Sequence, residues 1–88
     1  MKYAIIEGAV VSSMDRLHRL LAEQLDFPAW YGGNLDALYD CLTDLTEETT
    51  VILFHSQALA ETLGTNYTRF CQVLKDAAAE NPHLHIQY

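Results

Sequence analysis

The chain has 88 residues, half of them hydrophobic and 19% charged, which predicts a single globular domain over residues 1–88. Its net charge of −7 argues against nucleic acid as the direct partner, because phosphate binding requires basic side chains, and favours a basic partner. No apolar run approaches the roughly 20 residues that span a bilayer. The N-terminal stretch is too short for a signal peptide, and an acidic residue occurs in it too early. A cytoplasmic protein is therefore expected.

The first quarter of the chain predicts a strand followed by a helix. Residues 2–6 predict a short strand, which Glu7 and Gly8 end. Ser12 or Ser13 then offers an N-cap for a helix with its apolar residues on one face, namely Met14, Leu17, Leu20, Leu21 and Leu25. Charges of both signs on the opposite face indicate a solvated surface. Pro28 ends the helical region, because proline disfavours helical geometry in the residue before it.

A loop with two aromatic residues and two glycines, residues 30–33, leads into a second predicted helix. Asn34 is a good N-cap, since its side-chain oxygen can accept a hydrogen bond from an unpaired backbone N–H. The next apolar residues are spaced by three, four and three, which marks one buried helix face: Leu35, Leu38, Leu42 and Leu45. The other face collects Asp36, Asp40, Thr43 and Asp44, with Tyr39 at its edge.

Charge in this region is one-sided. From residue 26 to residue 48 there are six acids and no Lys, Arg or His; the acids are Asp26, Asp36, Asp40, Asp44, Glu47 and Glu48. Like charges four residues apart on a helix cost roughly 0.2–0.5 kcal/mol per pair. A purely solvated face usually mixes Lys with Glu. Aromatic residues beside the acids (Trp30, Tyr31 and Tyr39) are expected to be exposed, and this combination is typical of interface hot spots.

The second half of the chain predicts a strand, two helices and a strand. Residues 50–54 are a continuous, β-branched apolar run, typical of a central strand buried on both faces. Ser56 is expected to cap a short helix that runs to Leu63 and is closed by Gly64. A last helix is expected to start at residue 65 or 66 and to end before Pro82. Residues 83–88 alternate in polarity and predict the final strand.

The expected order β-α-α-β-α-α-β predicts an α/β fold with a three-stranded parallel sheet and residues 50–54 in its middle. Long helical connections are what parallel neighbouring strands require, and right-handed crossovers place the helices over the sheet. The two cysteines, Cys41 and Cys71, lie on or beside apolar helix faces and are expected to be free thiols.

Catalytic and metal-binding alternatives find less support. His83 and His85 would share one face of a strand, but no further ligands follow at a recognisable spacing. Asp36 and Asp40 could form an acid–base pair or a Mg²⁺ site in a hydrolase, yet no His, Lys or Arg of the region could act with them. The loop lacks the ending of a P-loop, and Cys41 has no obvious general base. We therefore expect that the protein is not an enzyme and that it binds no cofactor and no metal. A titration with Mg²⁺ and Mn²⁺ that shows no binding would eliminate the hydrolase hypothesis.

The segment FPAWYGGNLDALYDCLT, residues 27–43, closely resembles the signature of the barstar family, the small intracellular inhibitors of secreted bacterial ribonucleases. The resemblance covers essentially the whole chain, although only residues 26–43 are specific. It implies a barstar-like fold in which the second helix and the loop before it plug the active site of a ribonuclease. The acidic side chains would lie where substrate phosphates sit, which implies an inhibitor, immunity protein or antitoxin.

By position, the resemblance implies that Asp40 is the main phosphate mimic and that Asp36 is its partner one turn earlier. Trp30 stands where the family usually has a tyrosine that stacks on the catalytic histidine of the enzyme. The other expected partner-binding residues are Tyr31, Gly32, Asn34, Leu35, Tyr39, Thr43 and Asp44 around the second helix, and Asp76 and Glu80 on the last helix.

Five departures from the family pattern are expected on or near the rim of this face. Tyr39 and Leu45 replace tryptophans, and Gly33 stands where an acid is frequent. Thr49 stands where some members have a proline before the central strand, and Asp76 is one methylene shorter than the usual glutamate. These changes leave open a second hypothesis, a barstar-like module that neutralises a different class of basic toxin. In either case we expect a 1:1 complex with a protein partner and a monomer when free. We expect no binding to nucleic acid or to a membrane.

Overall fold

The computed structural model describes residues 1–88 and confirms the predicted α/β fold and its order of elements. These are β1 (Lys2–Glu7), α1 (Met14–Leu25), α2 (Leu35–Thr43), β2 (Thr49–Phe54), α3 (Ser56–Leu63), α4 (Thr65–Glu80) and β3 (Leu84–Gln87). The three strands form one parallel sheet in the order β1-β2-β3, so β2 lies in the middle as predicted. No helix is both long enough and apolar enough to cross a bilayer.

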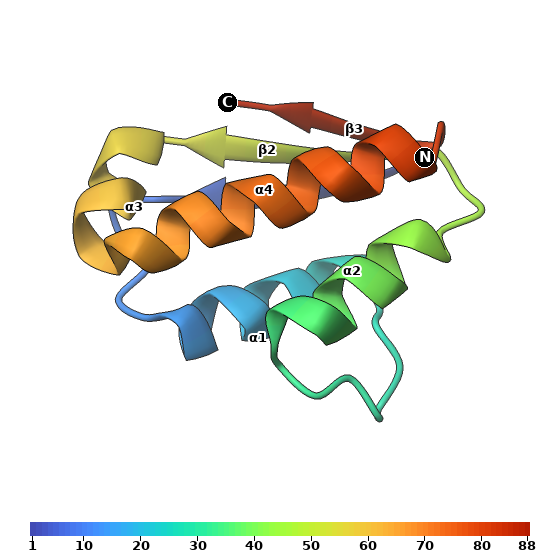
Figure 1. The fold of residues 1–88 in the computed structure, drawn as a ribbon, viewed down its shortest axis with the longest axis horizontal. Helices are drawn as coiled ribbons and strands as arrows, with labels where there is room; N and C mark the ends of the chain where they lie inside the picture. Colours follow the sequence, from blue (N-terminus) through green and yellow to red (C-terminus); the bar gives the residue numbers. More distant parts are fainter.

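The helices cover one face of this sheet. Figure 1 shows α4 running along the strands in the opposite direction, α1 and α2 next to each other below it, and α3 at one end. Both crossovers, from β1 to β2 and from β2 to β3, step across the sheet in the same direction. Two right-handed crossovers in the same direction place their helices on the same side. The other face of the sheet is therefore left without a covering layer.

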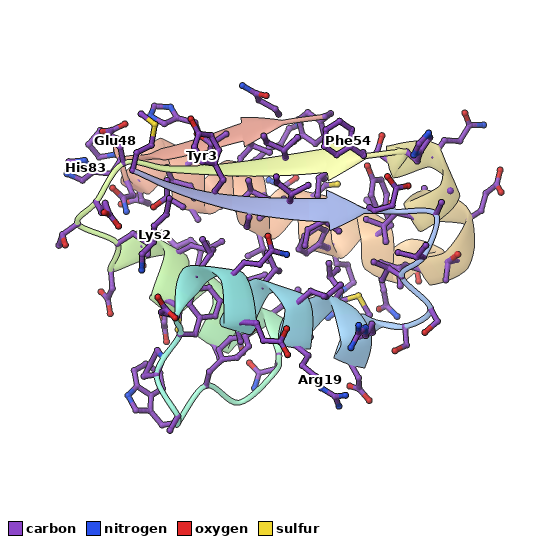
Figure 2. The ribbon with its side chains drawn as sticks, turned by 180° about the vertical axis from the view of Figure 1, so that it is seen from behind. Lys2, Tyr3, Arg19, Glu48, Phe54 and His83 are labelled. Carbon is purple, nitrogen blue, oxygen red and sulfur yellow. The ribbon has the colours of Figure 1, made fainter.

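This arrangement corrects one prediction, because β2 is not buried on both faces. Val51 and Leu53 point into the core, whereas Ile52 is half-buried and Phe54 is 48% exposed. Figure 2, which views the molecule from behind, shows Phe54 near the end of β2 and Tyr3 on the adjacent strand. The continuous apolar run was misleading since it does not distinguish a strand covered twice from one with an exposed apolar face.

The core lies between the sheet and the helices. Its buried residues include Ala4 and Ile6 from β1, Leu17 and Leu21 from α1, Leu38 and Leu42 from α2, and Phe70 and Leu74 from α4. The apolar spacing of three and four in α2 thus does bury one helix face, as predicted. Full burial of one leucine is worth about 1.5–3 kcal/mol, so this face holds α2 firmly against its neighbours.

The free edge of β1 is protected by a side chain of α1. The amide group of Gln24 accepts a hydrogen bond from the backbone N–H of Ile5 (2.6 Å) and donates one to its carbonyl oxygen (2.9 Å). These are the two bonds that a neighbouring strand would make. Exposed strand edges are templates for unwanted pairing, so Gln24 both closes this edge and fixes α1 beside it.

Of the two N-caps predicted for α1, Ser13 is the one used, and it accepts from the N–H of Arg16 (3.1 Å). Two other element boundaries differ from those predicted. Ser56 does not cap α3; His55 holds the N-cap position in a left-handed conformation (φ 51°), where its ring Nδ1 lies 2.6 Å from Glu7 Oε1. Helix α2 ends at Thr43, so the half-buried Leu45 packs against the core from beyond the helix.

Candidate partner-binding site

The start of α2 is set by two adjacent residues. Gly33 adopts a positive φ of 66°, which a side chain would strain, and turns the chain toward the helix. Asn34 then caps the helix as predicted, because its Oδ1 accepts from the N–H of Ala37 at 2.8 Å. The side-chain oxygen of Asn34 is therefore engaged within the chain.

One side of α2 forms an acidic ridge, which we define as Asp36, Asp40 and Asp44. All three side chains are exposed. The chain has five ion pairs, and these use Glu7, Asp26, Glu47 and Glu48 but no carboxylate of the ridge. In Figure 2, one of these pairs, Glu48 with His83, lies at one end of the sheet. The acidic ridge is thus neither buried nor ion-paired with the protein's own cations.

The end of α2 is held by a residue that the sequence indicated only as a helix stop. Asn81 is 4% exposed, and its Nδ2 donates to the carbonyl oxygens of Leu42 and Leu45, both at 2.9 Å. Its Oδ1 accepts from the N–H of His83 at 3.0 Å. The last carbonyls of a helix have no partner inside it, and α2 has no basic residue in its last turn. A buried Asn from the end of α4 therefore closes the helix that carries the acidic ridge.

The loop before α2 combines a free aromatic residue with an anchored one. Trp30 is 67% exposed. Tyr31 is half-buried, its ring centroid lies 4.9 Å from that of Phe27, and its hydroxyl lies 2.5 Å from Nδ1 of His18. The expectation that Tyr31 is exposed is therefore wrong, and so is that for Tyr39, which is half-buried against the core. Only Trp30 is offered freely to a partner.

His18 was not recognised from the sequence as part of this region. It is 5% exposed and lies on the apolar face of α1, one turn after Met14 and before Leu21. Burial lowers the pKa of His18, an effect that the nearby carboxylate of Asp15 opposes, and burial raises the pKa of the Tyr31 hydroxyl. Burial thus favours the neutral form of both groups. The position of His18 in the apolar spacing of α1 was the signal that it would be buried.

Other expected site residues serve the helix or lie on α4. The hydroxyl of Thr43 donates to the carbonyl of Tyr39 at 2.9 Å, so it belongs to the hydrogen bonding of α2 itself. Asp76 and Glu80 are exposed on α4, the helix that packs against α2, and Asp76 accepts from Gln72 at 2.9 Å. Gly32 is exposed and Leu35 half-buried at the two ends of the turn into α2.

The region shows no activated nucleophile and no metal cluster. Cys41 is a free, buried thiol, and burial together with the charges of Asp44 and Asp40 raises its pKa, which disfavours the reactive thiolate. Cys71 is also free. No group of three or more His, Cys, Asp or Glu side chains is arranged to hold a metal ion. The chemistry that the site offers is therefore negative charge on a fixed helix, next to an exposed indole.

The chain matches a known protein family over its whole length. The family model for Barstar, described as the barnase inhibitor, matches residues 1–88. A protein of Bacillus subtilis (strain 168) that bears the name "Putative ribonuclease inhibitor YrdF" is 35% identical over 81 residues, which cover 91% of this chain and 89% of the relative.

Proposed function

The chain belongs to the barstar family, and from this premise we propose that it inhibits a basic bacterial ribonuclease by covering its active site. The family consists of inhibitors, and the prediction that the chain is not an enzyme is thereby confirmed. The proposal concerns the target and the way in which it is bound. It draws on the acidic ridge, the exposed Trp30 and the two caps that fix α2.

The observation that carries the proposal is that the carboxylates of the acidic ridge are exposed and unpaired. A ribonuclease binds the phosphates of RNA with Arg, Lys and His in a concave site. Carboxylates on successive turns of a helix present negative charge about 5–6 Å apart. Asp40 and Asp36 would therefore take the places of neighbouring phosphates, without first breaking any ion pair in the inhibitor.

The rigidity of α2 also favours binding of the target. Asn34 caps the start of the helix, Asn81 closes its end, and Leu38 and Leu42 are fully buried. A binding surface that is already in its bound shape loses less conformational entropy on association. We propose that Asp40 occupies the centre of the interface, with Trp30 stacking on an active-site side chain and with Asp76 and Glu80 as outer contacts.

The assembly follows from the single acidic face. One inhibitor would cover one active site, which gives a 1:1 complex of a free monomer with its target. We further propose that the inhibitor acts in the cytoplasm, where a ribonuclease endangers the RNA of the cell. Opposite charge on the two proteins would steer their encounter and speed association.

A second candidate target is a basic toxin of another class. The departures at Gly33, Tyr39 and Leu45 favour it, because they lie on or near the rim of the binding face, whereas Asp36 and Asp40 match the family by position. The two targets are distinguished by affinity capture on the immobilised protein. A captured basic protein with ribonuclease activity supports inhibition of a ribonuclease, whereas one without that activity supports the second candidate.

The direct test uses barnase, the enzyme that the description of the family names. Increasing amounts of the protein are added to a fixed amount of barnase while RNA hydrolysis is followed. The proposal predicts that activity falls in proportion to the added protein and reaches zero near one equivalent. Full activity in the presence of a large molar excess would contradict it for this enzyme.

A further inference from the structure

A polar hollow of about 370 Å³ lies where the N-terminal ends of α1, α2 and α4 meet. Asn34 and Asp36 line it from α2, Asn66 and Arg69 from α4, and Met14 and the buried His18 from α1. The hollow therefore connects the first carboxylate of the acidic ridge with an arginine. Neither the charge pattern of residues 26–48 nor the resemblance to the family assigned this arginine a role.

Arg69 has no partner within the chain. Its side chain is exposed and takes part in none of the five ion pairs, although Asp36 lines the same hollow. The residues one turn away on α4 offer no carboxylate, since they are Thr65, Asn66, Gln72 and Val73. A cation near the start of a helix also gains nothing from the helix dipole. The position of Arg69 thus brings no visible benefit to the fold.

The side chain of Arg69 lies on the face of α4 that carries the expected outer contacts. At about 100° per residue, positions 69, 76 and 80 fall within about 40° of one another around the helix axis. Asp76 and Glu80 are therefore in line with Arg69 on α4. The side of α4 that would face a partner bound to the acidic ridge has a basic end beside Asp36 and an acidic end further along.

Resting on the proposed function, we propose that Arg69 is a specificity-determining residue, which binds a carboxylate of the ribonuclease next to the cation that Asp36 meets. A guanidinium group presents a planar fork of N–H donors that matches a carboxylate with two parallel hydrogen bonds. A ribonuclease with an acidic side chain at the rim of its cationic site would be favoured. One with only cations there would meet Arg69 as a like charge and be rejected.

The test compares charge reversals at two arginines against barnase. Arg69→Glu removes the proposed contact, and Arg16→Glu is the matched control, because Arg16 is an exposed arginine of α1 that does not line the hollow. Both variants change the net charge by the same amount, so the change in overall charge is matched. Arg69→Lys keeps the charge but loses the fork. Circular dichroism verifies that each variant is folded, and the dissociation constant is measured for each complex.

We expect Arg69→Glu to weaken binding at least about tenfold more than Arg16→Glu, with Arg69→Lys between wild type and Arg69→Glu. When surface carboxylates of barnase are replaced one at a time by alanine, the effect of Arg69→Glu should disappear for one of them. Equal effects of the two reversals, or no coupling to any carboxylate, would overturn the role of Arg69 while leaving inhibition intact. A wild-type protein that does not bind barnase would overturn both proposals for this enzyme.

Discussion

The imidazole of His18 and the hydroxyl of Tyr31 are hydrogen-bonded across the boundary between α1 and the loop that leads into α2. The bond ties the loop to a buried residue of a different element. The preceding residue, Trp30, is exposed, so an anchored aromatic residue positions a free one. Placement of the indole, and of the first turn of α2 behind it, therefore depends on a contact outside the binding face.

Removal of this hydrogen bond should lower stability. Tyr31→Phe keeps the ring but leaves Nδ1 of His18 without its partner, so we expect the free energy of unfolding to fall by about 0.5–1.5 kcal/mol. Tyr3→Phe is the control, because Tyr3 is an exposed tyrosine in the same fold. Urea denaturation measures both variants. A loss at Tyr31 no greater than that at Tyr3 would show that the bond does not stabilise the loop.

Acidification should weaken the fold through His18. Burial lowers the pKa of His18 below its ordinary value of 6.5, so the unfolded chain takes up a proton more readily than the native protein. The contribution of neutral His18 is fully present above pH 6.5 and is lost as the pH falls from there toward the lower pKa of the folded state.

The measurement is urea denaturation of the wild type and of His18→Gln at pH 8 and pH 5.5. We expect the wild type to lose more stability than the variant between these two values. The pKa values of Glu7 and Glu48 are also lowered, in Glu7 chiefly by its bond from the N–H of Ala9 and in Glu48 by the bonds from His85 and His83. Their contribution is lost only as the pH falls below 4.5, outside this window. Parallel losses in both proteins would exclude His18 as the group responsible.

Loss of the buried cap at the end of α2 should be costly. Asn81→Ala leaves the carbonyl oxygens of Leu42 and Leu45 without their donor in a buried place, so we expect a decrease of about 1–3 kcal/mol in the free energy of unfolding. Asn66→Ala, at an exposed position of α4, should stay within about 0.5 kcal/mol of wild type. Thermal or urea denaturation gives both values, and similar values for the two variants would refute the capping role.

Association with the target should depend strongly on salt. If opposite charges steer the encounter, the association rate constant falls as ionic strength rises, because the Debye length shrinks from about 10 Å at 0.1 M to about 3 Å at 1 M. Stopped-flow mixing with barnase over this range measures the rate. The double variant Asp36→Asn/Asp44→Asn should have a lower association rate constant at low salt. Its rate constant should also fall less as salt is added. A rate that does not respond to salt would argue against charge-steered binding.

Local patterns in the sequence were enough to predict the topology. The spacing of Leu35, Leu38 and Leu42 gave the buried face of α2, and the long helical connections gave a parallel sheet. The exposed face of β2 could not be read from its apolar run, because covering layers depend on the direction of the crossovers. His55, left-handed at the start of α3, likewise contacts Glu7, which is distant in sequence.

The parts of the candidate site that lie within one segment of the sequence could be predicted. The residues that support the site from distant segments were missed. The acidic ridge and its Asn34 cap lie within one segment, and the structure places them as expected. Asn81 closes the same helix from 36 or more residues away, and His18 anchors Tyr31 from another helix. No pattern within a segment indicates such partners. The resemblance to the family implied which residues face a target, but only for the positions that it matched.

The central claim is that carboxylates of the acidic ridge bind the cationic site of a ribonuclease. Isothermal titration calorimetry of barnase with wild type, Asp40→Ala and Arg19→Ala tests it most directly. Arg19 is the comparison because its exposed side chain projects from α1, as Figure 2 shows. We expect Asp40→Ala to weaken binding by about 2–5 kcal/mol and Arg19→Ala to leave it nearly unchanged. Equal effects of the two substitutions, or undiminished binding by Asp40→Ala, would contradict the claim.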